Sequence, residues 1–187
     1  MTDTATPIKP WKVRASKKIL ETPWLTVRQD TCELSDGSVI DDYFVTERAD
    51  VVGVVPITED GTVVMNRQYK HGIGEIVMEI PAGMIDKGEE PEAAGRRELE
   101  EETGYIAGEM TLLSAMVASP TSQNNLYYVY LAKDVKPGGT KETNAREQIQ
   151  NELVPLDRVE EMIATGEINV LWTVAALYLA INKTKQT

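Results

Sequence analysis

The chain has 187 residues, of which 42% are hydrophobic and 26% are charged, and its formal net charge at pH 7 is -11. This length and apolar content suit one hydrophobic core and argue against a disordered chain. The excess of acidic side chains repels phosphate polymers and no basic patch offsets it, so we expect no nucleic-acid binding. One cysteine, Cys32, and one histidine, His71, exclude a disulfide framework and a zinc site built on the usual Cys and His ligands.

The two ends of the chain carry no pattern that is typical of a membrane protein. Residues 1–9 lack the apolar stretch of a signal peptide. Residues 168–181 form the longest apolar tract, but the tract is short for a membrane span and is interrupted by Asn169 and Thr173. We therefore expect a cytoplasmic protein without membrane contact, in which this tract forms a buried helix.

The predicted elements alternate between strands and helices along the chain. Residues 19–47 have the pattern of a hairpin around a turn at 35–38. Further strands are predicted at 51–57, 62–69, 75–80, 111–117 and 126–131, helices at 91–104, 157–165 and 171–181, and a polar loop at 133–151. Strands interleaved with three helices predict an α/β sandwich preceded by a small N-terminal β hairpin unit.

The predicted helix between Pro91 and Gly104 is unusually rich in charge, with seven charged residues among the eleven at 92–102. At about 100° per residue, Glu98, Glu101 and Glu102 fall on one face. Their mutual repulsion and the negative end of the helix macrodipole both oppose this arrangement. Such a face is either solvated or holds positive charge, and Mg²⁺ and Mn²⁺ prefer carboxylate, carbonyl and water oxygens as ligands.

The spacing of these residues resembles the Nudix box, G-x5-E-x7-R-E-U-x-E-E-x-G-U, where U is a bulky apolar residue. The matching residues are Gly83, Glu89, Arg97, Glu98, Leu99, Glu101, Glu102 and Gly104. Tyr105 departs from the pattern, because the family carries an aliphatic residue at the last position. The sequence Glu-Ile-Pro-Ala-Gly at 79–83, the pair Ser119-Pro120 and the N-terminal hairpin are similar to the ADP-ribose pyrophosphatase branch of the family.

The resemblance implies a Nudix-type α/β/α sandwich with a mixed sheet over residues 47–187. It also implies an N-terminal β unit over residues 1–46 that forms a homodimer and stacks on the nucleobase. The implied activity is a Mg²⁺-dependent hydrolysis of the diphosphate in nucleoside diphosphate sugars, with Mn²⁺ as a substitute and ADP-ribose, cleaved to AMP and ribose 5-phosphate, as the leading substrate. GDP-mannose or a broad range of such sugars is one alternative, and a module that binds a nucleotide sugar without cleaving it is another.

The resemblance also assigns roles within the acidic helix. Glu98 and Glu102 would be direct metal ligands, and Glu101 a further ligand or one that acts through water. The backbone carbonyl of Ala82 would complete the inner metal site. Arg97 would orient the glutamates by ion pairing, and Glu89 would be either a lesser ligand or a capping residue.

The resemblance also implies a general base on a mobile loop that follows the last strands of the sheet. Alignment of Gln148 and Ile149 with the acidic loop of the family places Glu147 at the position of the base. The second acid of that loop would fall on Ala145, so the chain departs from the family there. Glu142 and Glu152 are the alternatives, and without the resemblance all three acids would be ordinary solvated loop residues.

The substrate-binding residues are also expected from the resemblance. Trp24 and Tyr43 match the aromatic positions that sandwich the nucleobase in similar dimeric enzymes, although both residues could instead fill the core of the hairpin or a dimer interface. Lys70 stands where the family usually carries an arginine that contacts the diphosphate, and Arg67 could share that contact. Glu79 could bind hydroxyl groups of the terminal sugar or brace its strand.

Overall fold

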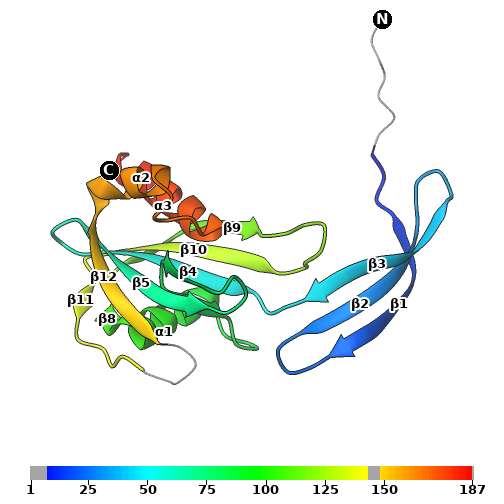
Figure 1. Cartoon of the computed structure of the whole chain (residues 1–187), viewed down its shortest axis with the longest axis horizontal. Helices are drawn as coiled ribbons and strands as arrows, with labels where there is room; N and C mark the ends of the chain where they lie inside the picture. The colour runs from blue at the N-terminus through cyan, green and yellow to red at the C-terminus, as the bar shows by residue number, and fades with distance from the viewer. Residues whose placement is uncertain (1–7, 143–147, 187) are drawn as a thin grey trace, which may run out of the picture. The chain divides into compact units, whose positions relative to one another are not determined.

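A computed structural model describes residues 8–142 and 148–186, and the chain divides into two compact units (Figure 1). The N-terminal unit comprises the residues up to Arg48 together with Ser119–Asn125, and the larger unit comprises Ala49–Ala118 and the residues from Leu126 onward. Each unit is described separately below. Among the described residues, no helix is long and apolar enough to cross a membrane.

The N-terminal unit is an antiparallel three-stranded sheet in the order β1-β2-β3. The strands are β1 (Lys12–Glu21), β2 (Thr26–Glu33) and β3 (Val39–Glu47). The predicted hairpin corresponds to β2 and β3, and its turn contains Gly37 with a φ of 86°, a conformation that suits glycine. Residues 119–125 join this unit because the Ser122 carbonyl accepts a hydrogen bond from Thr46 N–H at 2.8 Å.

The larger unit is built on a mixed seven-stranded sheet with a continuous path β12-β5-β4-β10-β9, in which β6 pairs with β5 and β7 pairs with β4. Strands β10 and β4 run parallel, and the other pairs are antiparallel. The strands are β4 (Val51–Ile57), β5 (Thr62–Lys70), β6 (Glu75–Glu79), β7 (Ala82–Met84), β9 (Met110–Val117), β10 (Leu126–Lys133) and β12 (Ile149–Pro155). A separate two-stranded ladder joins β8 (Tyr105–Ile106) to β11 (Lys136–Pro137).

Helices cover both faces of this sheet (Figure 1). On one face, α3 (Leu171–Thr184) and α2 (Val159–Ala164), which follows the short helix η1 (Leu156–Arg158), pack into the largest core cluster with Val55, Met65 and Leu131. On the other face, α1 (Pro91–Thr103) buries Leu99 against Val54 and Val64. The predicted α/β/α sandwich with a mixed sheet and a preceding N-terminal β unit is therefore confirmed.

Strands β4 and β5 share only one paired position, Ile57 with Val63, before they diverge. Beyond that point β5 pairs with β6 and β4 pairs with β7, so the chain from Glu79 to Met84 crosses from one strand to the other. The crossing places the backbone of Ala82 and Gly83 in the opening of the sheet beside α1. This opening is where the acidic side chains of the helix meet the strands.

Several strands were not predicted from the sequence, namely β1, β7, β8, β11 and β12. Strand β1 was not predicted, because all ten of its residues are exposed and no alternation of apolar side chains marks the strand. The region 133–151 was expected to be a loop throughout, but it contains β11 and the first residues of β12. Three consecutive polar residues, Gln150, Asn151 and Glu152, interrupt the apolar pattern of β12, so its position became visible only through its pairing with β5.

Candidate active site

Helix α1 presents its acidic face because its other face is fixed against the sheet. Pro91 occupies the first turn, and Gly104 ends the helix with a φ of 75° while its N–H donates to the Glu100 carbonyl at 2.7 Å. Gly95 allows close packing, since a Cβ there would lie 3.1 to 3.2 Å from side-chain atoms of Met110, Val52 and Val54. Burial of Leu99 against the sheet then directs Glu98, Glu101 and Glu102 away from the core.

The carboxylate of Glu98 lies directly against the backbone of Gly83. A Cβ added at Gly83 would be 2.1 Å from the Glu98 carboxyl carbon and from one of its oxygens. No residue with a side chain fits there without displacing the glutamate. The Glu98 carboxylate occupies the space of a side chain at position 83, which explains why the sequence pattern has a glycine there.

Glu102, one turn further along α1, is held by two hydrogen-bond donors from the sheet. Its Oε2 accepts the Ala82 N–H at 2.9 Å and the Asn66 side-chain amide at 2.8 Å. The structure therefore brings the predicted metal residues Glu98, Glu102 and Ala82 together at the opening of the sheet. Asn66 was not among the residues expected from the sequence.

Arg97 lies among the acids on the exposed side of the same cluster. Its guanidinium donates two hydrogen bonds to Glu89, both at 3.0 Å, and further ones to Glu98 at 2.7 Å and Glu101 at 3.2 Å. It also donates to the Met84 carbonyl at 3.1 Å. Hydrogen bonding to Glu89 and Glu98 raises the pKa of Arg97, and the same arginine, followed by the Asp86 N–H, lowers the pKa of Glu89.

The oxygen donors at this opening suit a divalent cation only in part. Among the described residues, no three His, Cys, Asp or Glu side chains are gathered closely enough to form a complete metal site. The carboxylates of Glu98 and Glu102 nevertheless both lie against the Ala82–Gly83 backbone, where the missing Cβ of Gly83 leaves room for Glu98 and the Ala82 N–H contacts Glu102. These are hard oxygen donors of the kind that Mg²⁺ and Mn²⁺ prefer, so the residues fit such an ion if water or a phosphate supplies further ligands.

Lys70 and Glu79, two of the predicted substrate-binding residues, form an ion pair beside this cluster. The Lys70 ammonium lies 2.8 Å from a Glu79 carboxylate oxygen, and Gln68 donates to the same oxygen at 3.4 Å. The Glu79 side chain is buried, whereas Lys70 is partly exposed. Arg67 is not brought to this group: it lies on the opposite face of β5 and pairs with Glu152 and Glu167.

The three candidate general bases differ in their surroundings. Glu147 lies outside the residues that the structure describes, so its role stays a prediction. The backbone N–H of Glu142 donates to the Glu101 carbonyl at 2.8 Å, which places this residue at the C-terminal end of α1. The Glu152 carboxylate is engaged with Arg67.

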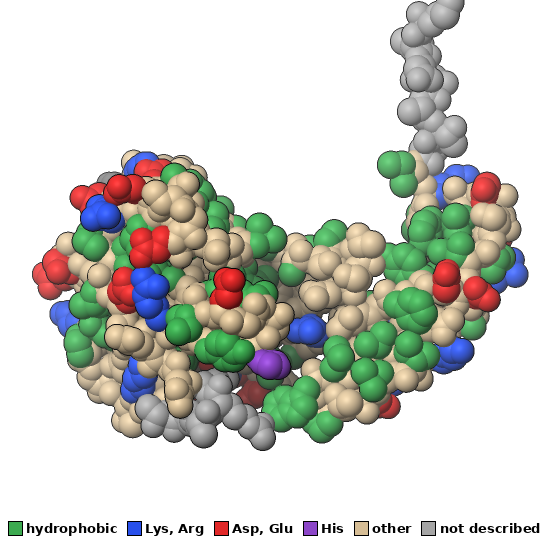
Figure 2. Space-filling view, viewed as in Figure 1, with side chains coloured by type: hydrophobic (Ala, Val, Ile, Leu, Met, Phe, Trp, Pro, Cys, Tyr) green, Lys and Arg blue, Asp and Glu red, His purple; other side chains and the backbone are tan. Residues whose placement is uncertain are grey.

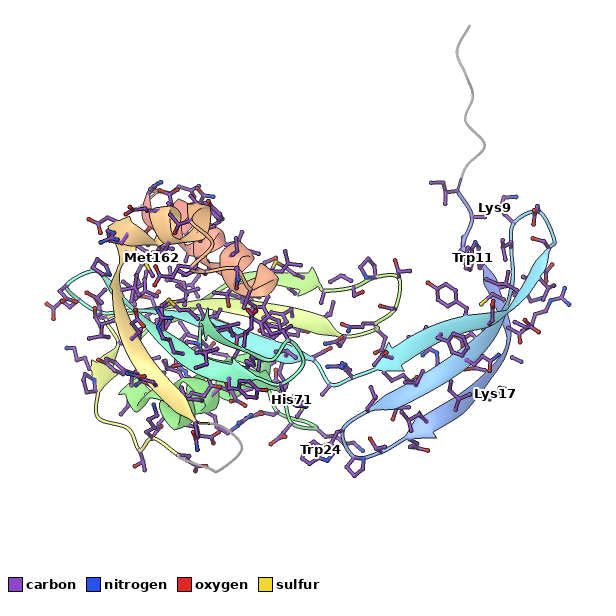
Figure 3. All side chains as sticks on the ribbon, viewed as in Figure 1. Lys9, Trp11, Lys17, Trp24, His71 and Met162 are labelled. Atoms are coloured by element: carbon purple, nitrogen blue, oxygen red, sulfur yellow. The ribbon has the colours of Figure 1, made fainter. Side chains whose placement is uncertain are left out.

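The two aromatic residues that were expected to stack on a nucleobase are not neighbours within one chain. Trp24 lies in the turn between β1 and β2 and is 74% exposed, whereas Tyr43 lies further along the sheet, where it pairs with Asp30 on β2. Tyr43 packs edge-on against Trp11, with ring centroids 5.6 Å apart, and its hydroxyl donates to the Thr121 carbonyl at 2.6 Å. Trp11 and Trp24 lie at opposite ends of the sheet (Figure 3).

Tyr127 is another residue that the sequence did not single out. Its hydroxyl is buried without a hydrogen-bond partner among the described residues, and its ring stacks on Trp172 with centroids 4.8 Å apart. Burial raises the pKa of Tyr127, and the nearby charges of Glu79 and Glu102 raise it further. The negative charges of Glu79 and Glu102 thus act on a buried hydroxyl in the core cluster that packs against α3.

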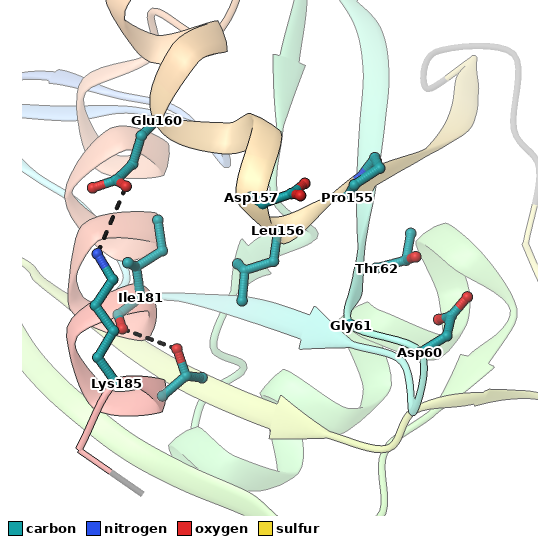
Figure 4. A pocket seen from close by; sticks show the side chains of 10 residues that line it. Asp60, Gly61, Thr62, Pro155, Leu156, Asp157, Glu160, Ile181 and Lys185 are labelled. Atoms are coloured by element: carbon teal, nitrogen blue, oxygen red, sulfur yellow. Dashed lines mark hydrogen bonds and ion pairs between the residues drawn. The ribbon is translucent and has the colours of Figure 1, made fainter.

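A pocket of about 550 Å³ lies elsewhere on the larger unit, between the turn that joins β4 to β5 and the C-terminal part of α3 (Figure 4). Glu160 and Lys185 form an ion pair across it at 3.7 Å. None of the residues expected to bind substrate or metal lines this pocket. It is therefore separate from the acidic cluster.

Comparison with known proteins identifies the family of this chain. A model of the Nudix domain matches residues 47–171, and a model of the nucleoside diphosphate sugar hydrolase N-terminal domain matches residues 11–46. An ADP-ribose pyrophosphatase of Bacillus subtilis is 33% identical over 137 residues, which are 72% of this chain and 74% of the relative. A methanol dehydrogenase activator of Bacillus methanolicus is 38% identical over 105 residues, which span 56% of this chain and 55% of the relative.

The fold has a close counterpart among solved structures. The crystal structure of an ADP compounds hydrolase superposes with a TM-score of 0.87 at 23% identity, and the match covers 97% of this chain and 98% of that chain. Identity at this level supports the fold, while the family rests on the Nudix domain match and on the similarity to the Bacillus subtilis protein. The chain therefore belongs to the Nudix family, and it is a Nudix hydrolase.

Proposed function

We propose that this protein hydrolyses the diphosphate of nucleoside diphosphate sugars in a Mg²⁺-dependent reaction, with ADP-ribose as the leading substrate and AMP and ribose 5-phosphate as products. The observation that carries the proposal is the placement of Glu98 and Glu102 against the Ala82–Gly83 backbone. The names of the relatives, an ADP-ribose pyrophosphatase and an ADP compounds hydrolase, favour the substrate class.

The metal would be held by the carboxylates of Glu98 and Glu102 and by the Ala82 carbonyl, with Glu101 as a further ligand or one that acts through water. Mg²⁺, or Mn²⁺ in its place, supplies charge neutralisation at the diphosphate and lowers the pKa of a bound water. The charge balance of the segment supports a need for cations. Residues 83–105 hold eight acids and three bases, and eight minus three leaves five negative charges.

The side chains of the protein would position the substrate and accept the proton. Lys70 would bind a phosphate oxygen as a point charge, and Glu79 would hold Lys70 or bind hydroxyl groups of the sugar. Arg67 would contribute only after release from Glu152 and Glu167. Glu147, with Glu142 and Glu152 as alternatives, would accept the proton of the attacking water, while Arg97 would keep the glutamates in place.

The N-terminal unit would complete the enzyme as a homodimer in the cytoplasm. In this arrangement Trp24 and Tyr43 come from different subunits and stack on the nucleobase. The separation of the two residues within one chain is compatible with this proposal, since each subunit would then supply one of them. The match of residues 11–46 to the N-terminal domain of nucleoside diphosphate sugar hydrolases favours it.

The test compares the wild-type protein with Glu102→Gln. We expect the substitution to lower kcat by about 100-fold or more, since metal ligation contributes several kcal/mol to such reactions, without loss of the fold. Glu92→Gln is the matched control, because Glu92 lies on the same helix but pairs with Arg96 at the exposed surface. Retained Mg²⁺-dependent turnover in Glu102→Gln would refute the metal assignment.

Substrate choice requires a separate measurement. ADP-ribose, GDP-mannose, UDP-glucose, a nucleoside triphosphate and a dinucleoside polyphosphate would be compared by kcat/KM at one Mg²⁺ concentration. We expect ADP-ribose to give the highest value. A higher value for GDP-mannose would change the substrate while leaving the diphosphate chemistry as proposed.

A further inference from the structure

One face of β5 carries a row of hydrogen-bond donors that point to the acids of the site. Asn66, Gln68 and Lys70 alternate along the strand, so their side chains share a face. Asn66 donates to Glu102, and both Gln68 and Lys70 donate to Glu79. The strand is thus a second element of the site, opposite the acidic face of α1.

Asn66 is the member of this row that contacts an expected metal ligand. The residue is completely buried, and its Nδ2 lies 2.8 Å from Glu102 Oε2. The Ala82 N–H reaches the same oxygen at 2.9 Å. Two donors from different strands therefore hold this oxygen of the carboxylate in place.

The stability of the folded protein does not by itself explain why residue 66 is an asparagine. Its Oδ1 is buried and has no hydrogen-bond partner among the described residues. A buried carbonyl without a partner is unfavourable, and the neighbouring positions Val63, Val64 and Met65 are apolar and fully buried. An apolar side chain would suit the core, whereas only a donor can hold Glu102.

We propose that Asn66 is a positioning residue of the metal site, which holds Glu102 in the orientation that binds a divalent cation. The proposal rests on the proposed metal-dependent function. Side chains that orient metal ligands through hydrogen bonds typically affect metal affinity about 10-fold to 100-fold when they are replaced. Asn66 lies on a strand of the central sheet, which provides a rigid support for this purpose.

Asn151 provides a matched control for a purely structural role. It pairs directly with Asn66 across β5 and β12 and therefore lies on the same face of the sheet. Its Nδ2 donates to the Thr103 carbonyl at 2.7 Å, and its Oδ1 accepts from Lys141 at 2.5 Å. Asn151 thus links the sheet to the backbone of α1, whereas Asn66 links the sheet to a carboxylate of the site.

The experiment titrates Mn²⁺ alone into metal-free, full-length protein and follows free Mn²⁺ by electron paramagnetic resonance. The variants are Asn66→Leu, Asn66→Ala and Asn151→Leu, and the urea midpoint of each metal-free variant is measured in parallel. We expect both Asn66 variants to bind Mn²⁺ about 10-fold to 100-fold more weakly than the wild type. Asn151→Leu should lower the urea midpoint and change the Mn²⁺ affinity much less.

The outcomes separate this inference from the proposed function. If the wild type binds Mn²⁺ and both Asn66 variants bind it equally well, the positioning role is wrong while the metal site stands. If Asn151→Leu weakens Mn²⁺ binding as much as the Asn66 variants do, the link between sheet and helix is structural and the inference is again overturned. If the wild type binds no Mn²⁺, both the metal site and the role of Asn66 fail.

Discussion

Gly83 shows how one residue with no side chain controls the geometry of the acidic cluster. Its backbone passes so close to Glu98 that a single added carbon would overlap the carboxylate. Ala82 on one side of it donates to Glu102. Two residues of one short strand therefore fix where two glutamates of α1 can lie, and the fit of the site to a cation depends on that contact.

We expect Gly83→Ala to lower Mg²⁺-dependent activity by about 100-fold, because a shift of about 1 Å in a positioned group can have an effect of that size. Steady-state kinetics and a thermal unfolding scan would be recorded for the variant. Gly72→Ala is the control, since a Cβ at Gly72 meets nothing within 4 Å. Equal activity of the two variants would show that the contact between Gly83 and Glu98 is dispensable.

At the scale of residues, the sequence could predict which site residues lie together when they are close to one another along the chain. Gly83, Glu98 and Glu102 fall inside a run of about one helix and its preceding loop, so spacing alone relates them. Asn66 lies 36 positions before Glu102, and only the folded sheet brings the two together. Arg67 was expected beside Lys70, but strand alternation sends it to the opposite face, where acids pair with it.

An ion pair between Glu89 and Arg97 joins the loop before α1 to the helix. Glu89 in the loop receives two hydrogen bonds from Arg97 in the helix and one from the Asp86 N–H. These contacts close the loop onto the helix just before the acidic face begins. The loop can then hold its position although it is exposed and carries several charges.

This ion pair predicts a pH dependence of stability. Arg97, followed by the Asp86 N–H, lowers the pKa of Glu89 below its ordinary value of 4.5. A carboxyl whose pKa is lowered by folding stabilises the folded protein above its unfolded pKa, and this contribution is lost as the pH falls through the folded pKa. We therefore expect Glu89→Gln to lower the urea midpoint at pH 7, and the gap to the wild type to narrow as the pH falls below about 4.5. A gap that is independent of pH would contradict the role of this pair.

At the scale of elements, strands with alternating or continuous apolar side chains were predicted well, and β4 agrees with its expected bounds of 51–57. Helices α1 and α3 began where Pro91 and the apolar tract indicated. Strand β1 was missed because it is exposed along its whole length and therefore lacks the periodicity that burial imposes. Strand β12 was missed because its polar residues, such as Asn151, contact α1 and the sheet and not an apolar core.

For the molecule as a whole, the net charge of -11 is concentrated in part where the proposed metals would bind. Residues 83–105 carry five of these negative charges, and Arg97 is the base that lies within the cluster. An acidic protein would ordinarily repel a negatively charged substrate. Two divalent cations held at this segment would bring its charge close to neutral, so the proposed metal site offers a physical reason why an acidic protein can bind a negatively charged substrate.

The N-terminal unit exposes an unusual number of large apolar side chains for a small sheet (Figure 2). Those that are at least 44% exposed are Ile8, Trp11, Val13, Ile19, Leu20, Trp24, Val39 and Phe44. Exposed apolar surface of this kind is typical of an interface, and a second copy of the chain is the partner that the proposed dimer requires. The core of the larger unit, in contrast, is formed by residues of that unit alone.

Removal of residues 1–46 is therefore expected to give a folded monomer with reduced substrate affinity. Loss of stacking on the nucleobase, at about 1 to 3 kcal/mol, corresponds to an increase in KM for ADP-ribose of roughly 5-fold to 150-fold. Light scattering after gel filtration would measure the mass, and circular dichroism the fold. Because the truncation also removes the partners of residues 119–125, full-length Trp24→Ala serves as the second variant and should raise KM without changing the urea midpoint. A truncated monomer with the wild-type KM, or a Trp24→Ala variant indistinguishable from the wild type, would refute the assignment of base stacking to this unit.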